Sequence, residues 1–340
     1  MDTRKRGASL SLVLIMMCLD PFVAEGSQNC TASGTTSNSI HGIIGQLGEI
    51  GNNLEAIANK LSTLHLLGTN STYPATSCQE IYNSKLNVQS GNYWLKDSNG
   101  AAVGVYCDMT LTCKGVGRGW RRVANLDSSD VSQQCPPDTI LSNFVPIRVC
   151  GINSFGAACS SASFSVQGVS YSQVCGKISG YQQGLTDAFA ILPGQQVTID
   201  SAYVDGVSLT HGSNPRNHIW TFASARDEVA QFPHTVCPCT NTAVSASAIQ
   251  PPSFVGNDYF CDTGSTNSAH LNPGMFFLDD PLWDGAGCGP SDTCCSLNNP
   301  PWFLKQLPAA TTDDIEMRLC RDQHQTDEKI HVETVELYVR

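Results

Sequence analysis

Sixteen cysteines in a chain of 340 residues constrain the fold more than any other feature of this sequence. In a reducing compartment so many thiols would serve metal clusters, but their spacings do not repeat as they do in zinc-binding modules. Only 14% of the residues are charged, against about 25% in an average soluble domain, which is typical of extracellular proteins. We therefore predict a secreted domain that is braced by disulfides.

Residues 1–26 have the pattern of a secretory signal peptide, with a basic start at Arg4–Arg6, an apolar run at Ala8–Leu19 and small residues near Gly26. The apolar run is shorter than the roughly 20 residues that span a bilayer, and no later stretch is long and apolar enough, so we predict a soluble, secreted protein without a membrane span. Loss of Cys18 with the signal leaves 15 of the 16 cysteines, an odd number. Cys30 stands alone in the N-terminal segment 27–38 and is our candidate for an interchain disulfide.

Residues 39–66 carry the clearest periodicity in the chain, because apolar residues alternate at spacings of three and four over four heptads. The a positions are Ile40, Leu47, Leu54 and Leu61, and the d positions are Ile43, Ile50, Ile57 and Leu64. Leucine at a with isoleucine at d favours trimers or tetramers, so we predict a coiled coil that forms a homotrimer or homotetramer. A single amphipathic helix that packs on its own globular domain is the alternative.

Two N-glycosylation sequons begin at Asn29 and Asn70, and both lie outside the globular domain that we predict for residues 77–340. Asn70 falls in the polar linker 67–76, which also contains Pro74. We therefore predict a glycoprotein that is modified outside its globular domain.

Residues 77–127 predict a β-hairpin at the start of this domain. Asn92–Leu95 and Val103–Tyr106 are aromatic and β-branched runs, and the Asn99-Gly100 pair between them favours a tight turn. Two short antiparallel strands follow from this pattern.

The same stretch resembles the N-terminal part of fibrinogen-like domains and of the related intelectin lectins. The resemblance rests on Glu80-Ile81 after Cys78, on Ser90–Leu95, on Val105–Met109 and on Gly119-Trp120. It implies a Cys78–Cys107 disulfide, an oligomeric protein and a family that often binds calcium. From residue 168 onwards the sequence is similar to secreted proteins of cnidarians, including proteins of the coral skeletal organic matrix.

The rest of the domain is rich in short strand-like runs. These are Ala190–Leu192, Tyr203–Leu209, Ile219–Phe222, Ile315–Leu319 and Val332–Val339, and the last alternates apolar and polar residues as a half-buried strand does. Ala223–Gln231 is the best helix candidate. The predicted fold class is thus a β-rich α+β fold, in which a disulfide-braced, fibrinogen-like globular domain follows an α-helical coiled-coil stalk.

Motifs of catalysis and of nucleic-acid binding are missing from the sequence. It contains no G-x-S-x-G elbow, no H-E-x-x-H pair and no glycine-rich phosphate loop, so we predict a protein that is not an enzyme. A net charge of −11 argues against a nucleic-acid partner.

Asp279, Asp280 and Asp284 form the candidate calcium site, since calcium binds carboxylate and carbonyl oxygens and these three residues lie on a loop rich in turn-forming residues. Aspartates that cap turns of their own backbone are the alternative explanation. His211 and His218, which flank the loop 212–217, are a weaker candidate for a cation site.

Tyr259, Trp283 and Trp302 are candidate ligand-binding residues, because sugar rings stack on exposed aromatic side chains while polar groups bind their hydroxyls. Burial of these large aromatics in the core is the alternative. Two functions follow from the sequence. The first is an oligomeric extracellular binding protein of the calcium-dependent, lectin-like kind that binds glycans. The second is a structural protein of an extracellular or skeletal organic matrix, with a part in biomineralisation.

Overall fold

The computed structural model describes residues 34–84, 86–144, 147–152, 158–184, 189–191, 198–200, 202–226, 252–264, 302–321 and 328–340. The chain divides into two units, Met1–Leu61 and Ser62–Arg340. Within the described residues, no helix has the length and apolar character that a membrane span requires.

The first long element is the helix α2 (Gly34–Leu66), which includes the segment 39–66 that the heptads predict to be helical. The apolar side chains of its heptads are largely uncovered in the single chain. Leu47, Leu54 and Leu61 at the a positions are 60–61% exposed, and Ile43, Ile50 and Ile57 at the d positions are 53–55% exposed.

The second unit begins with the short helix α3 (Cys78–Ser84), which starts at a capping box. The Ser77 hydroxyl accepts a hydrogen bond from the Glu80 amide at 3.0 Å, and the Glu80 carboxylate accepts one from the Thr76 amide at 2.6 Å. The Glu80 amide, which the helix itself leaves unpaired, and the Thr76 amide just before the helix are thereby satisfied.

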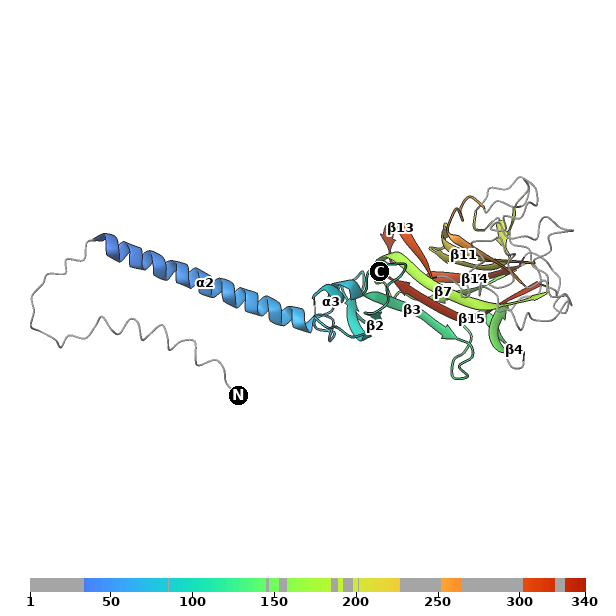
Figure 1. The fold of residues 1–340 in the computed structure, drawn as a ribbon, viewed down its shortest axis with the longest axis horizontal. Coiled ribbons are helices and arrows are strands. Elements are labelled where there is room, and N and C mark those ends of the chain that lie inside the picture. The colour runs from blue at the N-terminus through green and yellow to red at the C-terminus, as the bar shows by residue number, and fades with distance from the viewer. Residues whose placement is uncertain are drawn as a thin grey trace, which may run out of the picture. The chain divides into compact units, whose positions relative to one another are not determined.

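Strands make up most of the second unit, and eight of them form the first sheet. They are β1 (Gly91–Lys96), β2 (Ala102–Asp108), β3 (Trp120–Asp127), β4 (Thr139–Phe144), β5 (Ile147–Ile152), β7 (Tyr171–Gly184), β13 (Phe303–Thr311) and β15 (Glu328–Val339). Strand β15 pairs antiparallel with β3, β5 and β7, and Figure 1 shows β3, β15 and β7 side by side.

Five strands form the second sheet, in the order β12-β11-β10-β14-β6. They are β6 (Ala158–Phe164), β10 (Gly206–His211), β11 (Asn217–Arg226), β12 (Tyr259–Gly264) and β14 (Ile315–Arg321). Strands β11 and β12 are parallel, while the other neighbours are antiparallel. The strands β8 (Phe189–Ile191) and β9 (Ala202–Val204) pair separately.

The two sheets pack face to face over one hydrophobic core, as in a β-sandwich. The first sheet contributes Leu126, Ile178, Val335 and Leu337 among others, and the second contributes Val207, Leu209, Phe222 and Leu319. Trp220 of β11 and Phe303 of β13 stack across the core with their ring centroids 4.5 Å apart.

Four disulfides brace the described part of this domain, which confirms the predicted β-rich, disulfide-braced architecture. They are Cys78–Cys107, Cys113–Cys175, Cys135–Cys150 and Cys159–Cys320. The first is the pairing that the resemblance to fibrinogen-like domains implies. Cys30, the candidate for an interchain disulfide, lies outside the described residues.

The prediction of a helix at Ala223–Gln231 is wrong for the part that the structure describes. Ala223–Arg226 continue strand β11, where Ala223 lies opposite Gly206 of β10 and opposite Cys261 of β12. Ala223 is fully buried in this strand. Pairing on both sides overrides the local helix propensity of Ala and Arg.

Replacement of Gly180 by alanine should destabilise the domain by about 2 kcal/mol or more, the usual range for forced overpacking. A Cβ atom at Gly180 in β7 would overlap the carbonyl oxygen of His331 in β15, which cannot move without breaking the central ladder. Gly91→Ala is the matched control, because no atom lies within 4 Å of its added Cβ. Urea unfolding of the three proteins measures the effect, and equal stability of the two variants would contradict it.

Candidate functional site

The candidate site is an open cleft of about 250 Å³ between β2 and β3. These strands pair only at Cys107 with Arg121 and at Asp108 with Trp120. Beyond these pairs the strands separate, and the segment 165–167 approaches the gap. The residues that line the cleft are Gly104, Val105, Tyr106, Arg121, Arg122, Val123, Ala124, Asn125, Ser165 and Gln167.

Arg121 is the most buried charge in this lining, since only 4% of the residue is exposed. Its guanidinium donates to the Val166 carbonyl at 2.5 Å and to the Gln167 side-chain oxygen at 3.5 Å. Among the residues that the structure describes, its Nε has no acceptor and no carboxylate lies within ion-pair distance of it. Burial lowers the pKa of Arg121 to about 10, and the charge of Asp314 opposes this shift. The Arg121 side chain is therefore positively charged at neutral pH, and its hydrogen bonds go to neutral acceptors.

Arg122 adds a second positive charge to the cleft. Its guanidinium carbon lies 4.1 Å from the ring centroid of Tyr106, which is a cation–π contact across the gap. The lining contains two arginines and no carboxylate, although the whole protein carries a net charge of −11. The cleft is thus a local positive site on an acidic protein.

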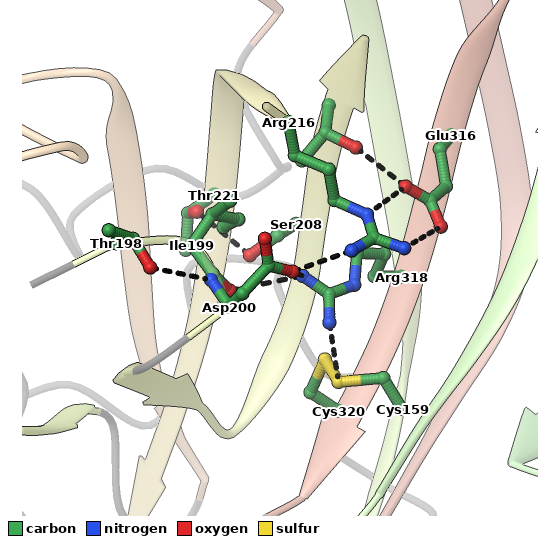
Figure 2. Close-up of polar contacts among 11 residues, drawn as sticks. Cys159, Thr198, Ile199, Asp200, Ser208, Arg216, Thr221, Glu316, Arg318 and Cys320 are labelled. Carbon is green, nitrogen blue, oxygen red and sulfur yellow. Dashed lines mark hydrogen bonds and ion pairs between the residues drawn. A yellow bond between two sulfur atoms is a disulfide. The ribbon is translucent and has the colours of Figure 1, made fainter. Parts of the chain in front are cut away.

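A different set of charges, on the outer face of the second sheet, forms a closed ionic network (Figure 2). Arg216 lies 2.7 Å from Glu316 and 2.6 Å from Asp200, and Arg318 lies 3.5 Å from Asp200. Although burial opposes it, hydrogen bonds from Arg216, Ser161 and Thr210 lower the pKa of Glu316. Two arginines and two carboxylates cancel each other, so this network ties the strands together and leaves no charge for a ligand.

Glu316→Gln should lower the free energy of unfolding by about 1–3 kcal/mol, because it removes the charge that Arg216 and the Thr210 hydroxyl contact in a partly buried position. The matched control is Asp200→Asn. Its side chain is 51% exposed, so its ion pairs should contribute less than about 1 kcal/mol. Chemical denaturation of both variants measures the difference, and a larger loss for Asp200→Asn would contradict this assignment.

His218 is the end of a chain of hydroxyl groups between β10 and β11. Its Nε2 lies 2.8 Å from the Thr221 hydroxyl, which lies 3.0 Å from the Ser208 hydroxyl. Ser208 and Thr221 are almost completely buried, so no solute reaches these hydroxyl groups. The chain therefore holds two strands together and does not form an open nucleophilic site.

Burial, together with the positive charge of Lys305, lowers the pKa of His218 to about 4, although the charge of Asp258 opposes the shift. Its Nδ1 is out of contact with solvent and has no partner within the described residues.

The unfolded protein therefore binds a proton at this histidine between about pH 6.5 and pH 4, and the folded protein does not. Stability should fall by about 1–3 kcal/mol as the pH falls through this window. His218→Gln should lose this dependence, and the difference between the two unfolding curves against pH isolates it from other groups. Parallel curves would show that His218 does not titrate in this way.

The structure describes only part of the site that the sequence predicts. Asp279, Asp280, Asp284 and Trp283 lie outside the described residues. Tyr259 begins β12, and burial raises its pKa. Trp302 precedes β13 and packs against Tyr338 with ring centroids 6.0 Å apart. Neither aromatic residue lines the cleft between β2 and β3.

His211 and His218 are not gathered around a cation. The Nδ1 atom of His211 lies 3.0 Å from an Asp313 carboxylate oxygen, while His218 contacts Thr221. Among the described residues, no group of three or more His, Cys, Asp or Glu side chains is arranged to hold a metal ion.

Of the two predicted glycosylation sites, Asn70 lies within the described residues and Asn29 does not. Asn70 is exposed in the turn that follows α2, where its side-chain oxygen accepts hydrogen bonds from the amides of Thr72 and Tyr73.

Sequence reasoning missed the cleft and its two arginines. The available signal was the pair Arg121-Arg122 inside a predicted domain with few basic residues, directly after Trp120. No protein-family model matches this chain, and no curated protein compared with it is significantly similar in sequence. The likeness to fibrinogen-like domains therefore stays a prediction from short motifs.

Proposed function

We propose that this protein is a secreted, multivalent binding protein whose chains assemble through α2 and whose β-sandwich heads carry the ligand sites. The observation that carries this proposal is the uncovered apolar seam of α2. Leu47, Ile50, Leu54, Ile57 and Leu61 repeat at the heptad spacing and are each more than half exposed in the single chain. Such a seam is buried when copies of the helix pack knobs into holes.

The four disulfides support the extracellular part of the proposal, because such bonds persist in oxidising compartments. The resemblance to fibrinogen-like proteins and intelectins also favours an oligomer. With Leu at a and Ile at d, the seam favours three or four chains. Several heads on one stalk bind a repetitive ligand by avidity, which strengthens weak single contacts by about 10²–10⁴.

Leu47→Asp with Leu54→Asp should convert the oligomer to monomers, because charged residues at a positions cannot be buried in the seam. Gly45→Asp with Asn52→Asp adds the same charge at f positions, on the opposite side of the helix, and should leave the oligomer intact. Light scattering after size exclusion measures the masses of proteins that all carry Cys30→Ser, which removes any contribution of Cys30 and leaves the disulfides of the globular domain intact. A monomeric wild-type protein would refute the assembly.

The finer part of the proposal is a calcium-dependent, lectin-like head that binds glycans. It rests on Asp279, Asp280 and Asp284 beside Trp283 in the sequence and on the resemblance to calcium-binding families. A glycan array in calcium and again in chelator tests it, with Asp280→Ala as the variant that should lose both binding and calcium-induced thermal stabilisation. Binding in neither buffer by an intact oligomer would favour the alternative, a structural protein of an extracellular or skeletal matrix, which the resemblance from residue 168 onwards supports.

A further inference from the structure

The starting observation is that the cleft between β2 and β3 contains a buried positive charge whose neutralisation is incomplete. Arg121 contacts a carbonyl and an amide oxygen, and both are neutral acceptors. Asp314 acts on it from a distance, but a carboxylate oxygen of Asp314 already accepts a hydrogen bond from the Val166 amide at 2.8 Å. A buried charge without a close counterion is costly, so the site gains free energy from an incoming anion.

The second observation is the charge of the lining. Arg121 and Arg122 are consecutive residues of β3, so their side chains leave the strand on opposite faces, and none of the residues that line the cleft is acidic. On a protein with a net charge of −11, most of the surface repels anions. A cleft of opposite sign concentrates the field and selects for a negative group. The guanidinium of Arg122 is only half-buried, so it can contact that group directly and through two parallel hydrogen bonds.

The third observation concerns the size and polarity of the cleft. Its volume of about 250 Å³ lies below the roughly 300–1,000 Å³ of pockets that enclose drug-sized ligands. Asn125, Ser165 and Gln167 supply donors and acceptors in the lining, and Tyr106 supplies an aromatic ring. The facing edges of β2 and β3 do not pair with each other beyond Cys107 and Arg121, so backbone groups are also available. Such a lining suits one small polar unit with a single acidic group.

We propose that this cleft binds the sulfate or carboxylate group of an acidic saccharide, with Arg122 contacting the charged group, the buried Arg121 adding positive charge to the lining, and the polar lining contacting the sugar hydroxyls. This inference rests on the proposed function of the head as a ligand-binding domain. None of the residues that line the cleft carries a carboxylate that could bind calcium, so we expect binding at this site without calcium. A saccharide unit is favoured because the small cleft offers amide and hydroxyl groups beside its arginines, which suit the hydroxyls of one sugar ring, and a short acidic peptide is the alternative that the test separates.

The test is calorimetric titration of the full-length secreted protein with N-acetylglucosamine 6-sulfate and with glucuronic acid, each in chelator. Both acidic sugars should bind at least tenfold more tightly than uncharged N-acetylglucosamine, and their affinity should fall as salt is added. Equal affinity for charged and uncharged sugars would overturn the proposal. Inorganic sulfate that binds as tightly as the sulfated sugar would overturn the assignment of a saccharide, and so would tighter binding of a short acidic peptide.

Arg122→Gln should weaken the affinity for the sulfated sugar at least tenfold, and Arg118→Gln is its matched control. Arg118 is exposed on the preceding loop, does not line the cleft and carries the same charge. An equal loss of affinity in the two variants would mean that only the net charge matters, and it would overturn the assignment of the site to the cleft. Arg121→Gln should also weaken binding, but it changes a buried group, so its folding is checked by thermal unfolding.

Gly104→Leu keeps both arginines and fills the space instead. Gly104 lines the cleft, and no atom lies within 4 Å of a Cβ atom added there, so the leucine should fold normally and block the sugar. Unchanged affinity would overturn the location. The monomeric variant Leu47→Asp with Leu54→Asp should keep the wild-type affinity for a monosaccharide, since one head suffices. Light scattering therefore tests the assembly through α2, and calorimetry tests the cleft, so one proposal can fail without the other.

Discussion

The pairing of β15 with β3 on one side and β7 on the other is the interaction on which the rest of the head depends. The core contains Val335, Leu337 and Val339 of β15. Backbone hydrogen bonds from β15 hold β3 on one side and β7 on the other. The strand lies at the end of the sequence, whereas β3 lies some two hundred residues earlier, so the sheet closes only through contacts of high sequence separation. Folding of this domain should be slow for the same reason, because loop closure precedes the gain from pairing.

The cleft is a consequence of this arrangement. Strand β3 pairs with β15 from Arg121 to Asp127, while β2 pairs with β1 and is fixed at its end, where the Cys78–Cys107 disulfide joins it to α3. Gly119 brings the chain against the backbone of Gln79 with φ of 85°, a conformation that favours glycine. Strands β1 and β15 thus hold β2 and β3 apart beyond the two pairs Cys107–Arg121 and Asp108–Trp120. The gap between them exposes Arg122 and leaves Arg121 without a close counterion among the described residues.

Local patterns in the sequence predict the local structure well. The β1–β2 hairpin follows from Asn99-Gly100 and its flanking runs, the course of β15 from its alternation, and α2 from its heptads. The prediction of a helix at Ala223–Gln231 is wrong for Ala223–Arg226, where pairing in the middle of a sheet outweighs propensity. Nothing local indicates that β3 pairs with β15 and parts from β2, so the importance of Arg121 and Arg122 was invisible. The aspartate loop and Trp283 lie outside the described residues, and that part of the prediction stays untested.

The proposed cleft site and the proposed self-assembling stalk are physically consistent with each other. A cleft of about 250 Å³ offers few contacts, and an acidic group held by the partly exposed Arg122 is screened by salt, so we expect a single head to bind weakly. Tight binding to a soluble, single ligand would need a deeper pocket. Repetitive acidic polysaccharides present the same group many times, and several heads on one stalk convert weak contacts into strong attachment only to such arrays. In the proposed assembly, weak binding at each single site would therefore make the oligomer selective for a surface or matrix over free sugars in solution.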